Sequence, residues 1–262
     1  MRVVSYGGGV QSTALLVLAA QREIPYRTFL FANTGDDSED PRTLNYVRHI
    51  AANYAATRGI DLHILDRRKR YGELETLWGR MMRRDSRALP IPVRMSNGKP
   101  GKRSCTKDFK VQPIGKWLKF HGASADNPAD VGIGISLDEI GRATNRHSEP
   151  YERIHYPLLE LGLRRTDCIE IIRKAGLLVP NKSACFFCPF KSRNSWAKMH
   201  RDRPELFRKA CHLEDILNIR RRHDHKDPVF LTSTGRPLRE AVTRAQDELP
   251  IDVGCDSGWC MT

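Results

Sequence analysis

A short apolar segment that ends in three consecutive glycines is the feature that most constrains this chain. Residues 2–6 have the length and apolar character of a buried strand, residues 7–9 are all glycine, and a helical pattern of apolar residues begins at Val10. Glycine lets successive backbone N–H groups curl into a concavity, and the first turn of a helix adds partial positive charge. This order of strand, glycine loop and helix predicts a site for phosphate or pyrophosphate.

Further strands alternate with helices along the first 160 residues. Apolar runs at 28–32, 61–65 and 131–135 have strand character, and helical spacing continues from Pro41 to Tyr54. Alternating strands and amphipathic helices form right-handed βαβ units. We therefore predict an α/β fold with a doubly wound, mainly parallel sheet. Residues 1–160 would form a nucleotide-binding domain, and residues 161–262 a helical, cysteine-rich region packed on it that holds a metal centre.

The glycine loop matches neither of the two commonest phosphate-binding patterns. No Gly-Lys-Ser/Thr follows it, so it is not a Walker A loop, and Gln11-Ser12 occupies the place of the last glycine in G-x-G-x-x-G. A tight turn that needs glycine for packing alone is the alternative. If the loop holds phosphates, the residues expected at them are Ser5, Gly7, Gly8, Gly9, Gln11 and Ser12, with Thr13 as a further hydroxyl.

The chain carries a large excess of positive charge. It has 44 Lys and Arg against 31 Asp and Glu, a formal charge of +13, which favours a polyanionic partner such as nucleic acid; a solvated basic surface is the alternative. Basic runs at 67–70 and 220–226 could contact phosphates, and Trp117, Trp196 and Trp259 could stack on bases.

The sequence shows no sign of a membrane or secreted protein. No apolar run reaches the roughly 20 residues of a membrane span, and the first residues lack the pattern of a signal peptide. We therefore expect a cytoplasmic protein with no membrane partner. The sequence leaves open whether the protein forms a homodimer.

Seven cysteines, two of them in a Cys-x-x-Cys pair, indicate a metal centre. Cytosolic thiols stay reduced, and the turn between Cys185 and Cys188 brings both sulfurs to one side. The phenylalanines at 186, 187 and 190 would form a dry shell around them. A zinc ribbon would need a second such pair, which the sequence lacks. Cys168 lies on the apolar face of a helix that we expect Thr166 to cap, which favours a core position.

Several motifs together resemble one superfamily. The loop from Gly7 to Ser12 looks like the pyrophosphate-binding loop (PP-loop) of ATP pyrophosphatases and PAPS reductases, although Gly7 and Gln11 stand where a serine and an aspartate are usual. Residues 31–35, 103–114 and 134–142 are similar to that family's second-strand end, Cys–Lys–Pro segment and fourth-strand loop. Residues 156–158 and 183–190 resemble its iron–sulfur-bearing branch, which includes the sulfur-inserting component of bacterial DNA phosphorothioation systems.

The resemblance implies an adenine nucleotide alpha hydrolase-like fold that binds ATP with Mg²⁺. It places Asn33, Thr34 and Gly35 beside the adenosine. Asp138 and Glu139 follow the fourth expected strand, where they could hold Mg²⁺ or orient Arg142 by an ion pair; a plain helix cap is the alternative. The candidate cations for the developing phosphate charge are Arg103, Lys107, Lys110 and Arg142.

The resemblance also implies a [4Fe–4S] cluster, with Zn²⁺ as the alternative. Its ligands would be Cys105, Cys185 and Cys188, with Cys255 as the fourth. Cys260 and Cys211 are alternative fourth ligands, and an open iron site is a further possibility.

The activity implied by the resemblance is ATP-dependent sulfur transfer. An ATP pyrophosphatase of this kind would adenylate a nucleic acid for sulfur insertion, with DNA phosphorothioation as the first hypothesis and tRNA thiolation as the second. It would need a sulfur donor such as a cysteine desulfurase. One alternative is a PAPS or APS reductase acting through Cys255 or Cys260. The other is a non-enzymatic, zinc-containing protein that binds nucleic acid.

Overall fold

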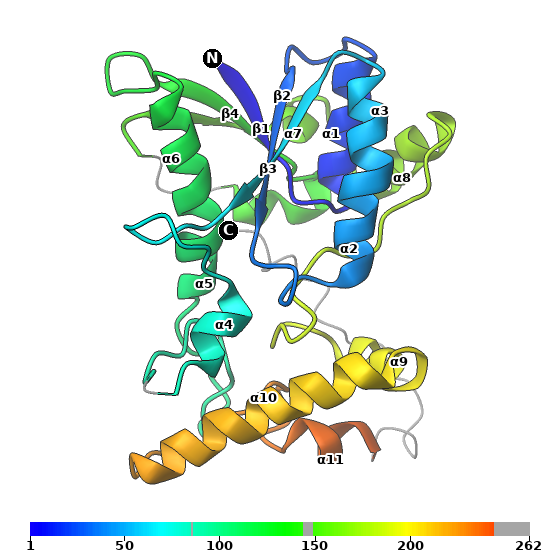
Figure 1. Cartoon of the computed structure of the whole chain (residues 1–262). Helices are drawn as coiled ribbons and strands as arrows, with labels where there is room; N and C mark the ends of the chain where they lie inside the picture. Colours follow the sequence, from blue (N-terminus) through cyan, green and yellow to red (C-terminus); the bar gives the residue numbers. More distant parts are fainter. Residues whose placement is uncertain (85, 144–148, 244–262) are drawn as a thin grey trace.

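Five parallel strands form the sheet, in the order β3-β2-β1-β4-β5. The computed structural model describes residues 1–84, 86–143 and 149–243. Every neighbouring pair of strands is parallel, and helices lie on both faces (Figure 1). The predicted doubly wound α/β fold is therefore confirmed. The strands are β1 (Arg2–Ser5), β2 (Thr28–Asn33), β3 (Asp61–Asp66), β4 (Ala129–Ile133) and β5 (Glu152–His155).

The two faces of the sheet bury separate hydrophobic clusters. One face packs against α1 (Val10–Ala20), α8 (Arg165–Lys174) and the continuous helix α2-η1-α3, and the other against α6 (Gln112–Phe120). Cys168 of α8 is fully buried among the apolar side chains of the first cluster, as predicted. The bounds of the continuous helix are α2 (Pro41–Asn45), η1 (Tyr46–Ala51) and α3 (Ala52–Ala56), and the short helix α7 (Pro157–Glu160) follows β5.

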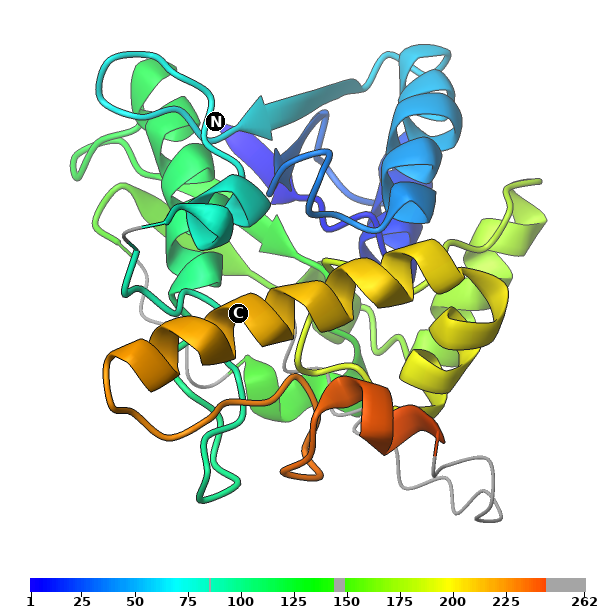
Figure 2. The ribbon, with the colours of Figure 1, turned by 60° about the horizontal axis from the view of Figure 1, so that its bottom comes forward.

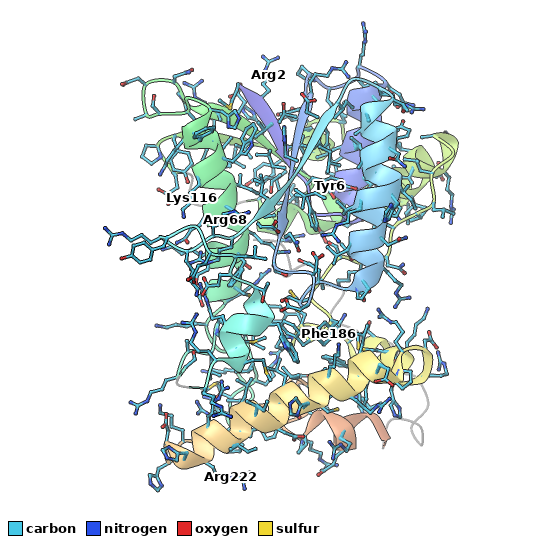
Figure 3. The ribbon with its side chains drawn as sticks, viewed as in Figure 1. Arg2, Tyr6, Arg68, Lys116, Phe186 and Arg222 are labelled. Atoms are coloured by element: carbon cyan, nitrogen blue, oxygen red, sulfur yellow. The ribbon has the colours of Figure 1, made fainter. Side chains whose placement is uncertain are left out.

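A helical module lies beyond the carboxyl edge of the sheet. Helix α10 crosses below that edge, with α9 and α11 beside it (Figures 1 and 2). Phe186 lies between the sheet and α10, and Arg222 lies at the far end of α10 (Figure 3). The module's apolar cluster joins residues from 77–109 to residues from 186–242, so chain segments far apart in sequence share one core. Its helices are α4 (Leu77–Met82), α5 (Ser104–Thr106), η2 (Lys107–Val111), α9 (Arg193–Asp202), α10 (Pro204–His223) and α11 (Leu238–Thr243). No helix in the described part of the chain is long and apolar enough to cross a membrane.

The structure departs from the sequence-based expectations at several places. β4 begins two residues before the expected strand, and the edge strand β5 was not predicted. Helix α8 is not capped by Thr166; it begins at Arg165, and the Asp167 carboxylate accepts a hydrogen bond from the Arg164 N–H at 2.7 Å. Trp196 is 1% exposed in the module's core, so it cannot be a stacking platform, whereas Trp117 stacks on His121.

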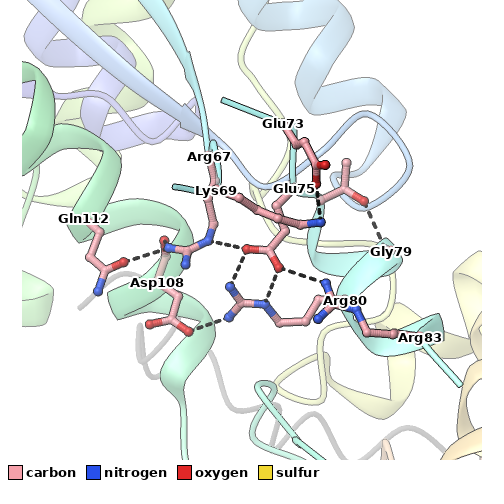
Figure 4. A network of polar contacts seen from close by, with 10 residues as sticks. Arg67, Lys69, Glu73, Glu75, Gly79, Arg80, Arg83, Asp108 and Gln112 are labelled. Atoms are coloured by element: carbon pink, nitrogen blue, oxygen red, sulfur yellow. Dashed lines mark hydrogen bonds and ion pairs between the residues drawn. The ribbon is translucent and has the colours of Figure 1, made fainter. Parts of the chain in front are cut away.

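Part of the first basic run is used by the fold itself (Figure 4). Glu75 accepts from Arg67 at 2.7 Å and from Arg80 at 2.6 Å, and Arg80 also pairs with Asp108 at 2.5 Å. Arg67 donates in addition to the Asp108 carbonyl and to Gln112. This network ties the segment after β3 to the helix that begins at Ser104, so Arg67 is a structural residue here.

The network predicts a pH-dependent loss of stability. Hydrogen bonds from Arg80 and Arg67 outweigh burial and lower the pKa of Glu75 to about 2. The stabilisation is therefore complete above the unfolded pKa near 4.5 and is lost as the pH falls toward 2, a total of about 3 kcal/mol. Glu75→Gln should destabilise the protein by that order at pH 7 and by progressively less toward pH 3, measured by urea unfolding. Glu73→Gln, which removes an exposed carboxylate paired with Lys69 alone, is the control and should change little. Equal effects of the two variants at pH 7 would contradict this account.

Candidate functional site

The glycine loop lies where ligands bind in doubly wound sheets. It follows β1, and β1 pairs with β2 on one side and with β4 on the other. The order 3-2-1-4-5 reverses between β1 and β4, so the connections leave the two strands in opposite directions and open a crevice at their carboxyl ends. The loop from Gly7 to Ser12 and the loop that starts at Gly134 face each other across this point.

Close packing shapes the glycine loop. Gly8 has φ +70°, a left-handed conformation, and a Cβ there would lie 3.0 Å from a Val47 methyl. A Cβ on Gly134 would lie 3.0 Å from the Ser12 nitrogen, so β4 approaches the first turn of α1 at backbone distance. The Ser12 hydroxyl turns back to the Gly9 backbone. Thr13 was expected to offer a further hydroxyl to phosphate. It is instead fully buried, and its hydroxyl is hydrogen-bonded to the Tyr6 hydroxyl at 3.0 Å.

A pocket beside the loop gathers basic side chains. Gly9, Gln11, Ser12 and Gly134 line it together with Arg142, Arg165, Lys182 and Glu139. Arg165 donates to the Gln11 side chain at 3.1 Å, and Arg142 pairs with Glu139, which favours the ion-pair alternative for Glu139. The Arg142 Nε is buried and has no hydrogen-bond partner among the described residues. Three cations against one carboxylate, with a free buried donor, fit an anionic group such as a phosphate.

A second, more apolar pocket opens between the ends of β1, β2 and β4. Ser5, Gly7, Tyr6, Phe31, Ile133 and Lys110 are among its lining residues. Lys110 comes from η2 and lies 4.0 Å from the buried carboxylate of Glu39. Burial opposes the charged form of Lys110, but the charges of Glu39, Cys185 and Cys105 outweigh it and raise the pKa of the ammonium. The lining is mainly apolar, with Ser5, Thr106, Lys110 and Glu152 as its polar and charged residues.

The three residues expected beside adenosine have structural partners. The Asn33 amide donates to Asp36 and Asp66 and accepts from the Gly35 N–H. Gly35 has φ +124°, and a Cβ there would lie 2.5 Å from Thr76. Thr34 donates to Glu39 at 3.0 Å and lies 3.3 Å from the Cys185 sulfur. These residues therefore shape the end of β2 and connect it to the cysteine loop.

The remaining candidate catalytic residues are spread around the site. Asp138 accepts from the Arg165 N–H at 2.6 Å, and so caps the start of α8 from a neighbouring loop. Arg103 lies over the Phe190 ring, beside the Cys-x-x-Cys segment. Lys107 is exposed on η2, one turn from Lys110. The structure therefore brings Lys110 and Arg142 to pockets at the carboxyl edge, and Arg103 to the cysteine loop.

The Cys-x-x-Cys segment is held against the end of β2. Cys185 forms an isolated antiparallel bridge with Glu39, and the Phe186 N–H donates to the Ser38 carbonyl at 3.1 Å. Phe186 and Phe187 are buried and pack on Trp78, whereas Phe190 and both cysteines of the pair are partly exposed. The Cys188 N–H donates to the Cys185 carbonyl, so a tight turn joins the two thiols.

Cys105 faces the same region from the first turn of α5. Both Cys105 and Cys185 belong to the rim of the module's core, and Lys110 lies within electrostatic range of both thiols. Burial is the main cause that raises the pKa of each of the two thiols. A metal centre must therefore displace the thiol protons when it binds.

Thiolates of Cys105, Cys185 and Cys188 have the chemistry of iron or zinc ligands, but the structure does not assemble them around a single ion. Among the described residues, no group of three or more His, Cys, Asp or Glu side chains is arranged to hold a metal ion. Cys211 is buried on α10, where burial raises its pKa to about 11, which suits a core thiol. Cys255 and Cys260, the other candidate fourth ligands, lie outside the described residues, as does Trp259.

Two structural residues of the site were missed from sequence. Glu39 is 2% exposed and connects Thr34, Lys110 and the cysteine loop, and Arg165 links α8 to Gln11. Neither stands out in sequence, because an acidic loop residue and a basic residue in a first helical turn are common on surfaces. No protein-family model matches the chain, and neither does any curated protein sequence.

Proposed function

We propose that this protein is a PP-loop ATP pyrophosphatase that adenylates a nucleic acid for sulfur insertion. The observation that carries the proposal is the position of the glycine loop. It lies at the β1/β4 switch point, between a basic pocket on one side and an apolar pocket on the other. A triphosphate on the basic side and an adenosine on the apolar side would use both pockets at once.

The proposed reaction has two balanced steps. An oxygen of the acceptor attacks the α-phosphorus of ATP, the bond to the β-phosphate breaks, and pyrophosphate leaves. A sulfur nucleophile then attacks the activated acceptor atom, and AMP leaves with the acceptor oxygen. The nucleophile is hydrosulfide, supplied either as such or from the persulfide of a donor such as a cysteine desulfurase after two-electron reduction by a thiol, which becomes a disulfide. If the acceptor is a DNA phosphodiester, the product is a phosphorothioate.

The chain's own residues would bind and polarise the phosphates. Arg142, Arg165 and Lys182 line the basic pocket, where their charges would oppose the charge that develops on the leaving pyrophosphate. Mg²⁺, held by the phosphates with Asp138 or Glu139 nearby, would supply further charge neutralisation. A cluster on Cys105, Cys185 and Cys188 would supply sulfur-handling or electron-transfer chemistry when bound.

A basic groove far from the glycine loop supports a polyanionic acceptor. It lies between the segment after α4 and the last turns of α10, has a volume of about 440 Å³, and includes Arg84, Arg87, Arg221, His223 and Lys226. Asp224 is the one acidic residue among those that line the groove, and its carboxylate is already paired with Lys226 and Arg87. Such a surface fits a phosphate backbone, and favours a nucleic acid over a small acceptor.

Product analysis tests the proposal. Protein purified without oxygen is incubated with α-labelled ATP, Mg²⁺, sulfide and either DNA or tRNA. We expect equal amounts of AMP and pyrophosphate, with more product when the correct nucleic acid is present. Arg142→Gln should lower the rate by at least about tenfold, the loss of one charged hydrogen bond to a phosphate. Arg173→Gln, an equal charge change on an exposed position of α8, is the control.

Other outcomes would assign the alternatives. Release of ADP and phosphate, or no ATP cleavage, would contradict the proposal. Reduction of APS or PAPS to sulfite would identify a sulfonucleotide reductase. Zinc in the purified protein together with nucleic-acid binding and no turnover would identify a non-enzymatic binding protein.

A further inference from the structure

A third basic cavity lies beside the Cys-x-x-Cys loop. It has a volume of about 150 Å³ and is bounded by the loop at 181–192, the start of α2 and the start of α9. We call it the Lys191 cavity. Lys182 lines both this cavity and the basic pocket of the glycine loop, so the two are neighbours on one stretch of chain. Cys188 lines the Lys191 cavity as well.

The charge of the Lys191 cavity is strongly unbalanced. Five of its lining residues are basic, namely Arg42, Lys182, Lys191, Lys198 and Arg203, and Asp40 is the one acidic residue that lines it. The Asp40 carboxylate already accepts from Arg203 at 2.7 Å and from the Arg42 N–H at 3.0 Å, as the cap of α2. The lining of the cavity therefore carries five basic side chains against one carboxylate.

One of these cations has a buried donor without an acceptor, and a second has no carboxylate close to it. The Arg203 Nε is buried and has no hydrogen-bond partner among the described residues. The Lys191 ammonium is partly buried, lies 5.9 Å from the centre of the Trp196 ring, and has no carboxylate within 4 Å in the described part of the chain. Burial lowers the pKa of Lys191, with the Cys188 and Asp40 charges acting in the opposite direction. Buried donors without partners are costly, which favours an anion that would satisfy them.

The start of α9 adds to this preference. α9 is ten residues long and begins at Arg193, directly after Lys191 and Ser192. The Ser192 hydroxyl accepts from the Ser195 N–H at 3.2 Å and lies 2.9 Å from the Ser195 hydroxyl, and both serines line the cavity. The partial positive charge of the helix start and two hydroxyl groups therefore point to the same space as the cations.

We propose that the Lys191 cavity binds a tetrahedral oxyanion, and that this oxyanion is the phosphodiester of the acceptor strand. Binding there places the acceptor phosphate beside Cys188 and next to the pocket of the glycine loop. The identity of the oxyanion rests on the proposed function, whereas the binding of an oxyanion by this cavity does not.

Titration with single-phosphate ligands tests the proposal without ATP. The ligands are inorganic phosphate and the dinucleotide TpT, which carries one phosphodiester and cannot span to the distal groove. We expect the full-length protein to bind both, with Lys191→Gln weakening each by about tenfold through the loss of one charged hydrogen bond. Lys198→Gln should act in the same direction. Lys209→Gln removes the same charge from an exposed position on α10 that does not line the cavity, and should change either affinity by less than about twofold.

The possible outcomes separate this proposal from the proposed function. If Lys191→Gln and Lys198→Gln both behave like Lys209→Gln while keeping their thermal midpoints, the cavity does not bind the oxyanion. Binding of inorganic phosphate without TpT would overturn the assignment to the acceptor strand. Failure of ATP cleavage in the wild-type protein would overturn the proposed function, and would leave the titration result as it stands.

Discussion

Gly134→Ala is expected to weaken ATP binding by at least about tenfold and to destabilise the fold by about 2 kcal/mol. A Cβ at this position would lie 3.0 Å from the Ser12 nitrogen, 3.1 Å from the Gln11 carbonyl carbon and 3.2 Å from the Ser12 Cα. All three are backbone atoms in the first turn of α1, so no side-chain rotation can relieve the contact. β4 is held in register against β1, and the strain must therefore displace the glycine loop.

A second glycine after β4, in the short 3-10 helix η3 (Leu137–Arg142), provides the control. Gly141 lies seven residues further on, and a Cβ there would meet no atom within 4 Å. Gly141→Ala should leave both the free energy of unfolding and ATP affinity close to the wild-type values. ATP affinity is measured by titration calorimetry and stability by urea unfolding. A folded Gly134→Ala protein with wild-type ATP affinity would show that the glycine loop is only a packing turn.

Lys110→Met is expected to destabilise the protein by about 3 kcal/mol, because it leaves a buried carboxylate without its cation. The Glu39 side chain is 2% exposed, and Lys110 is the only cation within 4 Å of it in the described part of the chain. The remaining polar contact of the carboxylate is the Thr34 hydroxyl at 3.0 Å. The same change should reduce ATP-dependent turnover, since Lys110 lines the apolar pocket.

A double-mutant cycle separates the ion pair from simple loss of packing. Glu39→Gln removes the buried charge and keeps a group that can bond to Thr34. Combined with Lys110→Met, it should recover most of the lost stability, with a coupling free energy of about 2 kcal/mol from urea unfolding. Additive effects to within about 0.5 kcal/mol would contradict a functional pairing of the two residues.

Much of the fold could be predicted from the sequence because it is encoded locally. Residues 2–6 are mainly apolar, as in a strand that is buried on both faces. Pro41 is suited to a first helical turn, and the helical spacing of Cys168 with Ile172 indicates a buried helix face. The edge strand β5 escaped notice because Glu152, Arg153 and His155 give it the polar pattern of a loop. Charged residues are common on edge strands, where they discourage pairing with other chains.

Part of the candidate site could likewise be predicted from the sequence. The glycine loop is recognisable because three adjacent glycines are rare outside a special backbone conformation, and Gly8 does adopt a positive φ. Outside the site, in the helical module, the role of Glu214 on α10 could not be predicted, because a glutamate on a basic helix normally faces solvent. Here its carboxylate is 3% exposed and accepts from the Leu231 and Leu238 N–H groups, and burial raises its pKa to about 7.

The sequence by itself therefore determined the parallel α/β architecture and the glycine loop after the first strand. The spacing of apolar residues and the position of glycines are local properties of the sequence, so they predict strands, helices and turns directly. Only the tertiary structure decided which charges serve the fold and which face a cavity. Arg67 is hydrogen-bonded to Glu75, whereas the buried Arg203 Nε has no partner among the described residues and lies in the cavity that Lys191 and Cys188 also line. That distinction depends on partners from segments more than a hundred residues apart, such as Asp40 and Arg203, and no local pattern records those contacts.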